Sequence, residues 1–264
     1  MEVCQMAVLS KKTIDRFSKN VSKFQGILRL AKDRDVNESD TVSIITDILA
    51  DVLGYDKYLE ITRELAIRST YCDLAIKVDN NIQYLIEAKA IGIELKENHL
   101  RQAIDYGANH GIPWVILTNG ISWEIYKIRF EKPINYDLVC SFNFLEINHK
   151  KEVDQEKLFI ISKEGLSKDA REDFHEKVQS FNRFIVGAII LNENVVNTIK
   201  KELKKLNAGI KVDNDQIQKM LSSEVLKRDV IEGDEAIKAQ ARMKRFYKKQ
   251  ESAASKIKVE AVSV

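Results

Sequence analysis

The chain has 264 residues, 44% of them hydrophobic, and a formal net charge of +2 at pH 7. This size and hydrophobic content allow one large domain, or an average domain with a smaller one, without stabilisation by disulfides or structural metals. No apolar run is long enough to span a membrane, and no glycine-rich phosphate loop or dinucleotide fingerprint is present, so these residues offer no ATP-motor or Rossmann site.

The three cysteines, Cys4, Cys72 and Cys140, include no CxxC pair. An odd number without metal-ligand spacing argues against a disulfide framework or a zinc ribbon. The first residues lack the charged-then-apolar pattern of a secretory signal. We therefore expect a cytoplasmic protein in a reducing compartment.

Two amphipathic helices are expected first. Apolar residues recur at three- and four-residue steps from Ile14 to Leu28. A second helix is predicted to start after Asn37, a favourable N-cap, and to carry an apolar face as far as Val52. Gly54 suits the left-handed cap at its end.

The pattern then becomes that of a sheet. Runs rich in β-branched and aromatic residues predict strands over residues 58–67, 73–78, 83–88, 114–118 and 123–128. A helix is expected over 96–109, and Asn119-Gly120 predicts a hairpin between the last two strands. This order predicts an α/β fold, in which helices flank a central mixed sheet.

Beyond residue 135 the sequence predicts an edge strand over 139–147, a polar linker over 148–157, and helices from 168 onward. One apolar stripe runs from Phe174 to Ile190, and further helices are expected over 213–222 and 233–250. The sequence therefore predicts four regions. Residues 1–30 form an N-terminal helix that packs on the core, and residues 31–148 form the main α/β domain. Residues 149–250 form a helical C-terminal region, and residues 251–264 form a loose tail.

Asp73, Glu87 and Lys89 are the candidate catalytic residues. Residues two apart on a strand point to the same face, so Glu87 and Lys89 emerge together. An antiparallel hairpin brings Asp73, at the start of the preceding strand, next to Glu87. Two carboxylates held close together favour a divalent cation, and oxygen ligands suit Mg²⁺. Bound Mg²⁺ would activate a water and stabilise phosphate charge, with Lys89 assisting.

Glu-x-Lys alone is a weak signal. It also occurs at 94–96 and 202–204, but only the pair at 87–89 follows an apolar strand paired with one that carries an aspartate. The alternative is a solvated charge pair at a strand end. Gln102 and Tyr106 share one helix face, and Glu38 begins a helix; alone, these are an ordinary polar face and a carboxylate favoured by the helix dipole.

The order Glu38, Asp73, Glu87-Ala88-Lys89 and Gln102-x-x-x-Tyr106 is followed by Leu-Thr-Asn-Gly at 117–120 and by Trp123. Over about residues 31–130, this order resembles the N-terminal nuclease domain of type I restriction enzyme R subunits. That domain is a PD-(D/E)xK nuclease that carries the Gln-x-x-x-Tyr motif of RecB-type nucleases. The resemblance implies a restriction-endonuclease-like core.

The resemblance also implies Mg²⁺-dependent hydrolysis of DNA phosphodiester bonds, with Mn²⁺ able to substitute. It makes Asp73 and Glu87 metal ligands, with the Ala88 carbonyl as a third and Glu38 as a further one. Lys89 becomes the catalytic lysine, and Gln102 and Tyr106 orient the DNA or the active-site groups. Glu64, on the first strand, is a weaker candidate.

Two features depart from those subunits. The translocating motor is absent from these residues, which points to a free-standing relative and puts ATP-driven translocation in doubt. Cys72 also stands where the motif has proline, a residue without a chemical role. A non-catalytic nucleic-acid-binding or assembly module that retains the nuclease fold stays open as the alternative.

The C-terminal part is basic. Residues 197–250 hold 14 Lys or Arg against 8 Asp or Glu. Within it, residues 242–249 include Arg242, Lys244, Arg245 and Lys248, with two aromatic residues and no acid, and could contact a nucleic-acid backbone. The alternative is a solvated helix end. The expected partner is DNA, without a membrane or nucleotide cofactor, and the C-terminal helices could also mediate homodimerisation or bind a partner protein.

Overall fold

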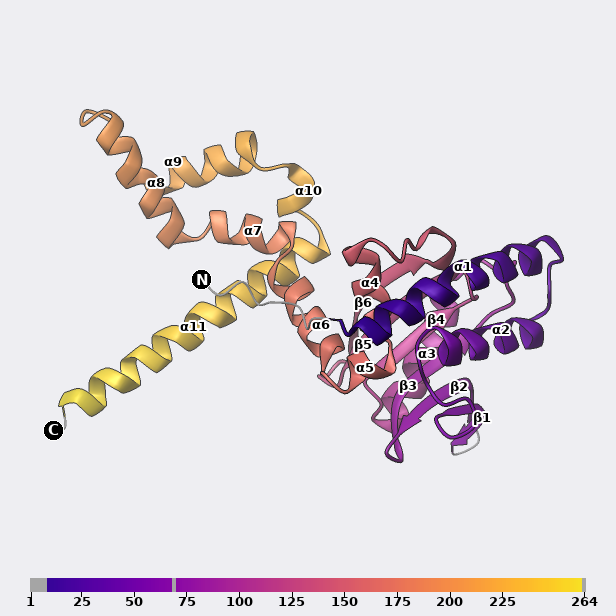
Figure 1. Cartoon of the computed structure of the whole chain (residues 1–264). Helices are drawn as coiled ribbons and strands as arrows, with labels where there is room; N and C mark the ends of the chain where they lie inside the picture. The colour runs from indigo at the N-terminus through magenta and orange to yellow at the C-terminus, as the bar shows by residue number, and fades with distance from the viewer. Residues whose placement is uncertain (1–8, 68–69, 263–264) are drawn as a thin grey trace. The chain divides into compact units, whose positions relative to one another are not determined.

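The computed structural model describes residues 9–67 and 70–262, and Cys4 lies outside them. The chain forms two compact units, which comprise Met1–His175 and Glu176–Val264 (Figure 1). The first unit contains a single sheet of six strands in sequence order. These strands are β1 (Ile61–Ile67), β2 (Thr70–Val78), β3 (Asn81–Ala88), β4 (Trp114–Thr118), β5 (Ser122–Arg129) and β6 (Asn135–Asn143).

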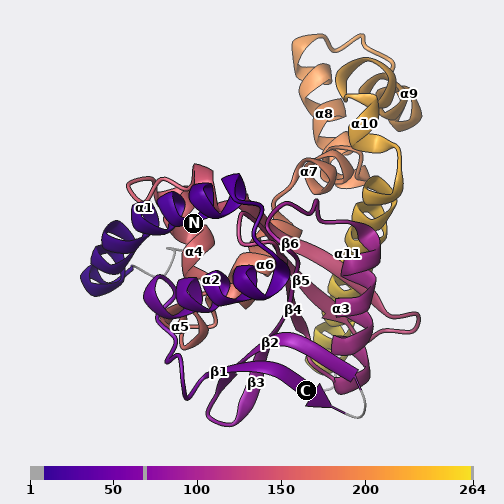
Figure 2. The same ribbon diagram turned by 90° about the vertical axis from the view of Figure 1, so that its right-hand side faces the viewer.

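The sheet is mixed, as predicted: β3 and β4 run parallel, and every other neighbouring pair is antiparallel. Helices cover both faces, with α1 and α2 on one side and α3 on the other (Figure 2). The helical elements of this unit are α1 (Lys11–Asp33), α2 (Glu38–Asp51), α3 (Glu97–His110), η1 (Phe144–Glu146), α4 (Glu152–Phe159), α5 (Lys163–Leu166) and α6 (Ala170–Ser180), the last of which continues past His175.

Two hydrophobic clusters lie on the two faces of the sheet. The larger joins α1 and α2 to the sheet through residues such as Phe17, Leu28 and Ile45, which are fully buried. The smaller joins α3 to the opposite face through Leu100 and Ile104. Removing this apolar area from water stabilises the fold by roughly 25 cal/mol per Å².

Local sequence signals explain several element boundaries. Asn37 caps α2, since its side chain accepts a hydrogen bond from the backbone N–H of Asp40. At the β4–β5 hairpin, Gly120 has φ 83°, and the Asn119 carboxamide accepts from the N–H groups of Ile121 and Ser122. Glycine suits this left-handed backbone, so the predicted Asn-Gly turn is confirmed.

The core of the first unit extends beyond the boundary expected at residue 148. Leu158, Ile160 and Ile161 are buried in the larger cluster. The hydroxyl groups of Tyr55 and Tyr84 donate to the carbonyls of Ile161 and Ile160, both at 2.9 Å. Residues 148–157, expected to be a linker, include most of α4, so the chain returns to the sheet before it leaves the first unit.

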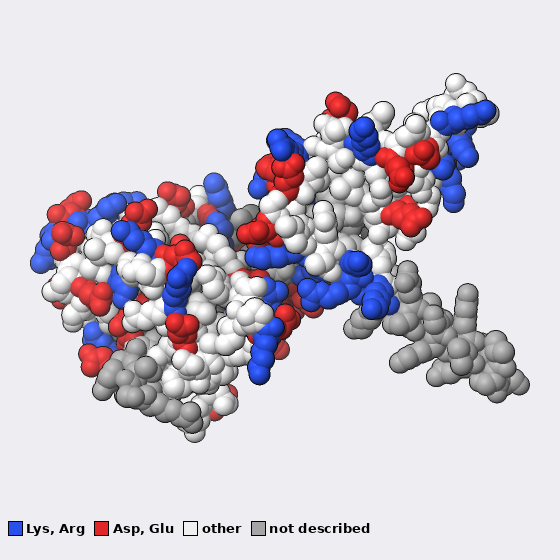
Figure 3. Space-filling model, turned by 180° about the vertical axis from the view of Figure 1, so that it is seen from behind, with Lys and Arg blue, Asp and Glu red and all other residues white. Residues whose placement is uncertain are grey.

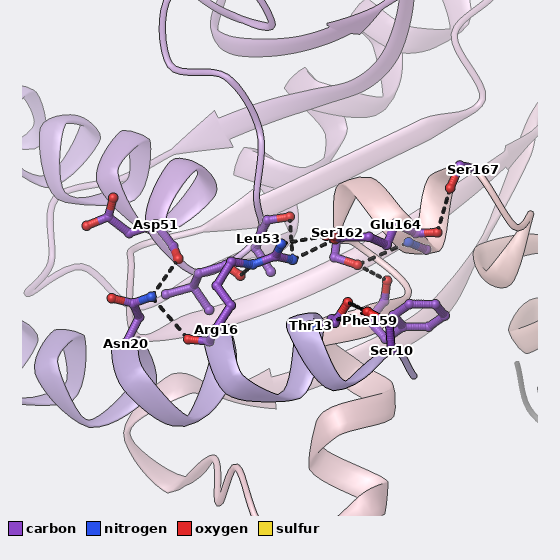
Figure 4. Close-up of polar contacts among 12 residues, drawn as sticks. Ser10, Thr13, Arg16, Asn20, Asp51, Leu53, Phe159, Ser162, Glu164 and Ser167 are labelled. Atoms are coloured by element: carbon purple, nitrogen blue, oxygen red, sulfur yellow. Dashed lines mark hydrogen bonds and ion pairs between the residues drawn. The ribbon is translucent and has the colours of Figure 1, made fainter. Parts of the chain in front are cut away.

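Arg16 fixes this returning segment to α1 (Figure 4). Its guanidinium donates to both carboxylate oxygens of Glu164, at 2.5 and 2.6 Å, and to the Val52 carbonyl at 2.8 Å. Nearby, the Asn20 side chain donates to the Asp51 carbonyl at 2.8 Å. A bidentate pair of this kind is among the stronger polar contacts in proteins. It joins α1, the end of α2 and α5.

The second unit is helical. Its elements are α7 (Arg183–Ile190), α8 (Glu193–Leu206), α9 (Asn214–Met220), the π-helical turn η2 (Leu221–Val225), α10 (Arg228–Ile231) and α11 (Asp234–Val262). Helix α7 packs against α10 and α11, and α8 packs against α9. Helix α11 continues through Val262, across residues that were expected to form a tail from 251.

The single apolar stripe predicted from Phe174 to Ile190 is interrupted. Asn182 caps α7 by accepting from the N–H groups of Phe184 and Ile185, and Phe181 is 78% exposed. The side-chain cap competes with continuation of the preceding helix, so the stripe divides between α6 and α7. Within the described residues, no helix combines the length and apolar character that crossing a membrane requires.

Candidate active site

The candidate site lies at the end of β3. Glu87 is the second-last residue of this strand, and Lys89 follows the strand directly. Its backbone N–H donates to the Thr118 carbonyl of β4 at 2.9 Å, which extends the parallel pairing by one residue. The Lys89 ammonium donates to Glu87 Oε1 at 2.6 Å. Only 4% of the Glu87 side chain is exposed, so this carboxylate is held inside the protein.

Asp73 reaches the same strand end from β2. The β2–β3 register pairs Leu74 with Ile86, and one further step along it puts Asp73 opposite Glu87. The Asp73 carboxylate accepts a hydrogen bond from the Ala88 backbone N–H through Oδ2 at 2.8 Å. The hairpin therefore brings together the aspartate, the glutamate and the lysine that were predicted from the sequence.

Glu38 comes from a different element, because it is the first residue of α2. Its Oε2 lies 3.9 Å from Lys89 Nζ, and half of its side chain is exposed. A carboxylate in the first turn is also favoured by the helix dipole. Glu38 thus contacts Lys89 from the rim of the site, while Glu87 contacts it from the interior.

The electrostatics follow from this crowding. Burial raises the pKa of Glu87, and the Asp73 and Glu38 carboxylates raise it further, against the lowering effect of the Lys89 hydrogen bond. Burial acts to lower the pKa of Lys89, but its hydrogen bond to Glu87 and the surrounding carboxylates outweigh this and raise the pKa. The cluster carries more negative than positive charge, so an added cation would relieve repulsion.

The oxygen donors suit Mg²⁺ better than a transition metal. No cluster of three or more His, Cys, Asp or Glu side chains that could hold a metal occurs in the described part of the chain. Magnesium needs fewer protein ligands, because it usually keeps several waters and binds through one or two carboxylates and the substrate. Asp73 uses Oδ2 and Glu87 uses Oε1 in the hydrogen bonds above, which leaves Oδ1 and Oε2 as available donors. The donor set therefore fits Mg²⁺, with the Ala88 carbonyl as a candidate third ligand.

Gln102 and Tyr106 have different surroundings on α3. The Tyr106 side chain is buried, and its hydroxyl donates to the Leu65 carbonyl of β1 at 2.8 Å. Gln102 is exposed. Among the contacts described for residues 9–67 and 70–262, none joins either residue to Asp73, Glu87 or Lys89. Tyr106 therefore connects α3 to β1, and Gln102 faces solvent.

Glu64 occupies an unusual place on β1. The β1–β2 register pairs Arg63 with Leu74 and Leu65 with Cys72, so Glu64 lies across from Asp73 in an interrupted position. Its φ of 50° is in the left-handed region, which is strained for a glutamate. The side chain is exposed. The local sequence contains no turn signal that would have revealed this conformation.

Thr41 lies next to the site but is not among the residues predicted from the sequence. This residue is fully buried on the first turn of α2, and its hydroxyl contacts the backbone just after Lys89, at Ile91. Its position three residues after Glu38 could have indicated such a contact, because the first turn of a helix often supplies capping contacts. The cations Arg242, Lys244, Arg245 and Lys248 lie on α11, in the second unit.

Comparison with known proteins identifies a related segment. Residues 43–139 match the family model described as Type I restriction enzyme R protein N terminus (HSDR_N). No curated protein and no solved structure matches the chain. The matched segment runs from within α2 to β6 and includes Asp73, Glu87, Lys89, Gln102 and Tyr106, while Glu38 precedes it. This part of the chain is therefore similar to the N-terminal domain of type I restriction enzyme R proteins, which supports a restriction-related nuclease domain.

Proposed function

We propose that the protein is a Mg²⁺-dependent endonuclease that hydrolyses DNA phosphodiester bonds and acts in restriction or defence against foreign DNA. The observation that carries this proposal is the joint position of Asp73, Glu87 and Lys89 at the end of β3. The match to the R-protein N terminus supports it independently, since it rests on the segment as a whole. Lysine and two acidic groups in this arrangement suit phosphate chemistry.

Each residue has a definite task in this proposal. Asp73 and Glu87 hold the metal, with the Ala88 carbonyl beside them and Glu38 at the rim. Bound Mg²⁺ supplies Lewis-acid stabilisation of phosphate charge and lowers the pKa of a water. The Lys89 ammonium, which contacts Glu87 without substrate, donates to a phosphate oxygen or to the attacking water when DNA is present.

In the reaction, the water oxygen forms a bond to phosphorus, and the bond from phosphorus to the leaving ester oxygen breaks. The water loses a proton to solvent or to a nearby carboxylate, and the leaving alkoxide takes up a proton. Gln102, exposed on α3, is proposed to contact the DNA, and Tyr106 to hold α3 in place beside β1. No nucleotide is required, so we expect this chain to cut DNA without ATP.

A cleavage assay of the purified protein tests the proposal. Plasmid and linear DNA, with RNA as a parallel substrate, are incubated with Mg²⁺ or Mn²⁺. Lys89→Ala and Asp73→Ala should each abolish cutting. Lys204→Ala serves as the matched control, because it removes a lysine from another Glu-x-Lys sequence on the exposed surface of α8. Unchanged cleavage in both site variants would refute the proposed active centre.

The second candidate is a non-catalytic module that binds nucleic acid and keeps the nuclease fold. The observation in its favour is the basic surface of the second unit, which needs no metal site. This candidate predicts salt-dependent DNA binding with no hydrolysis in any divalent cation. The Glu87 carboxylate is buried, and the nearby Asp73 carboxylate repels it. This favours the catalytic proposal, because a purely structural role gives no reason to hold the two carboxylates together.

A further inference from the structure

Helix α11 has a strongly basic segment. Residues 236–250 contain six Lys or Arg and no Asp or Glu. Figure 3 shows Lys and Arg side chains gathered over this part of the second unit. Lys244, Arg245 and Lys248 are exposed, and at 3.6 residues per turn they fall on one side of the helix. The described ion pairs neutralise none of these three, so their charge is available to a ligand.

A groove lies next to these cations, between α11 and the end of α7. Its volume is about 580 Å³, which is within the range of roughly 300–1,000 Å³ typical of ligand sites. Leu191 and Met243 provide apolar lining, while Lys244 and Lys248 provide charge, and Tyr247 lies between them in sequence. No carboxylate is among the described residues that line it. The groove therefore offers an aromatic and apolar surface with positive charge beside it.

Aromatic side chains accompany the cations. Tyr247 is half-buried in the groove, and the neighbouring Phe246 is 51% exposed, with ring centroids 5.6 Å apart. An exposed phenylalanine in a basic segment gains little from water. Proteins that bind single-stranded nucleic acid combine a positive track for phosphates with aromatic rings on which bases stack. The faces of bases in a duplex are already stacked on each other, so this combination selects an unpaired strand.

We propose that the groove between α7 and α11 is a binding site for single-stranded nucleic acid. Lys244, Arg245 and Lys248 contact consecutive phosphates, and a base stacks on Tyr247, with Phe246 available to the next. Charge complementarity favours this occupant over a second copy of the chain, since a symmetric contact would oppose two sets of these cations. The site acts without a metal and stands independently of the proposed nuclease centre.

Fluorescence anisotropy of the full chain in EDTA tests the site, because hydrolysis cannot interfere there. The probes are labelled oligothymidylate, oligouridylate and a DNA duplex of equal length. The test variant is Lys244→Gln with Arg245→Gln and Lys248→Gln. The control is Lys201→Gln with Lys204→Gln and Lys211→Gln, which removes three exposed lysines elsewhere in the second unit.

The test variant should lose at least about tenfold in affinity for single strands. Its salt slope, the steepness with which the logarithm of the binding constant falls with the logarithm of salt concentration, should decrease by about 2, because each phosphate contact on a single strand contributes about 0.7. The control should change affinity less than about twofold. Tyr247→Leu should weaken binding by about tenfold without changing the salt slope, because stacking releases no counterions. The two single strands compare a DNA ligand with an RNA ligand, and binding of either supports the site.

Three results would overturn the assignment. Equal losses in the test and control variants would reduce the interaction to general charge attraction. Tighter binding of the duplex than of both single strands would exclude base stacking as its basis. Displacement of the strand by poly-glutamate, at equal concentration of negative charge, would point to an acidic polypeptide as the occupant. Failure of the nuclease proposal has a separate signature, the absence of cleavage in Mg²⁺.

Discussion

The hydroxyl of Thr41 accepts a hydrogen bond from the Ile91 backbone N–H at 3.1 Å. The same hydroxyl donates to the Asn37 carbonyl at 2.8 Å. Both Thr41 and Ile91 are buried. One side chain thus joins the start of α2, which carries Glu38, to the chain that follows Lys89. We therefore expect the Thr41 hydroxyl, which takes no part in the proposed chemistry, to help keep Glu38 close to Lys89.

Replacing Thr41 by valine keeps the shape and removes both hydrogen bonds. The Ile91 N–H would then be buried without a partner, at a cost of about 1–3 kcal/mol in the free energy of unfolding. We also expect slower cleavage at saturating substrate, because Glu38 and Lys89 are no longer fixed together. Thr41→Ser keeps the hydroxyl and should restore both properties. Denaturant unfolding and single-turnover cleavage measure the two effects. A valine variant as stable as the parent would contradict the role assigned to this hydroxyl.

The raised pKa of Glu87 makes a prediction about pH and Mg²⁺. Burial raises this pKa most, so the folded protein binds the proton more readily than the unfolded chain. The contribution of Glu87 to stability therefore decreases as pH rises from the usual carboxyl pKa through the raised one. In the proposed site Mg²⁺ would bind the ionised form of Glu87, so the stabilising effect of Mg²⁺ should grow over the same pH window. A concentration one hundred times the dissociation constant should add about 2.7 kcal/mol.

Thermal unfolding with and without Mg²⁺, repeated across that pH window, provides the measurement. Asp73→Asn is the informative comparison, because it removes a proposed ligand and also removes a charge that raises the pKa of Glu87. Its response to Mg²⁺ should be much smaller than that of the parent. An equal Mg²⁺ effect in the two proteins would place the metal elsewhere.

Much of the site could be predicted because its geometry is local. Glu87 and Lys89 are two residues apart, and Asp73 is reached through one tight hairpin, so strand periodicity and register were sufficient. The Asn119-Gly120 turn was predictable for the same reason. Glu38 was harder, because a carboxylate at a helix start has an ordinary explanation in the helix dipole. Only the tertiary structure shows its approach to Lys89.

The parts that sequence could not show depend on contacts between distant residues. Ile160 and Ile161 follow a polar stretch, so the sequence did not place them in the core of the first unit. In the structure their carbonyls accept hydrogen bonds from the hydroxyl groups of Tyr84 and Tyr55. The division between α6 and α7 was hidden because the apolar period continues through Phe181, while the Asn182 cap ends the helix. In both cases the structure depends on hydrogen bonds that hydrophobic periodicity does not predict.

Tyr106 and Gln102 should behave differently on substitution, although one motif contains both. Tyr106→Phe removes the hydroxyl that donates to the Leu65 carbonyl, so it should cost about 1 kcal/mol of stability and leave cleavage close to normal at low temperature. Gln102→Ala changes an exposed side chain and should alter stability by less than about 0.5 kcal/mol. Its effect should appear as weaker DNA binding. Loss of cleavage by a fully folded Tyr106→Phe would instead assign this hydroxyl a direct role in the site.

Arg16→Met tests how the segment after α4 is held on the first unit. The Arg16 side chain is 17% exposed, and its guanidinium pairs with both oxygens of Glu164. Loss of the guanidinium therefore leaves a partly buried carboxylate without its main partner. We expect a loss of about 2 kcal/mol in the free energy of unfolding at pH 7, below the range for fully buried pairs because Glu164 is 32% exposed.

The effect of Arg16→Met should also depend on pH. Burial acts to raise the pKa of Glu164, but the Arg16 hydrogen bond and charge outweigh it and lower the pKa. The pair therefore contributes its stability above the usual carboxyl pKa and loses it as pH falls through the lowered one. Unfolding curves of the parent and the variant should converge in acid, and Glu164→Gln should show the same convergence. A gap between parent and variant that is independent of pH would mean that Arg16 acts through its carbonyl contacts at Val52 and Leu53 rather than through the ion pair.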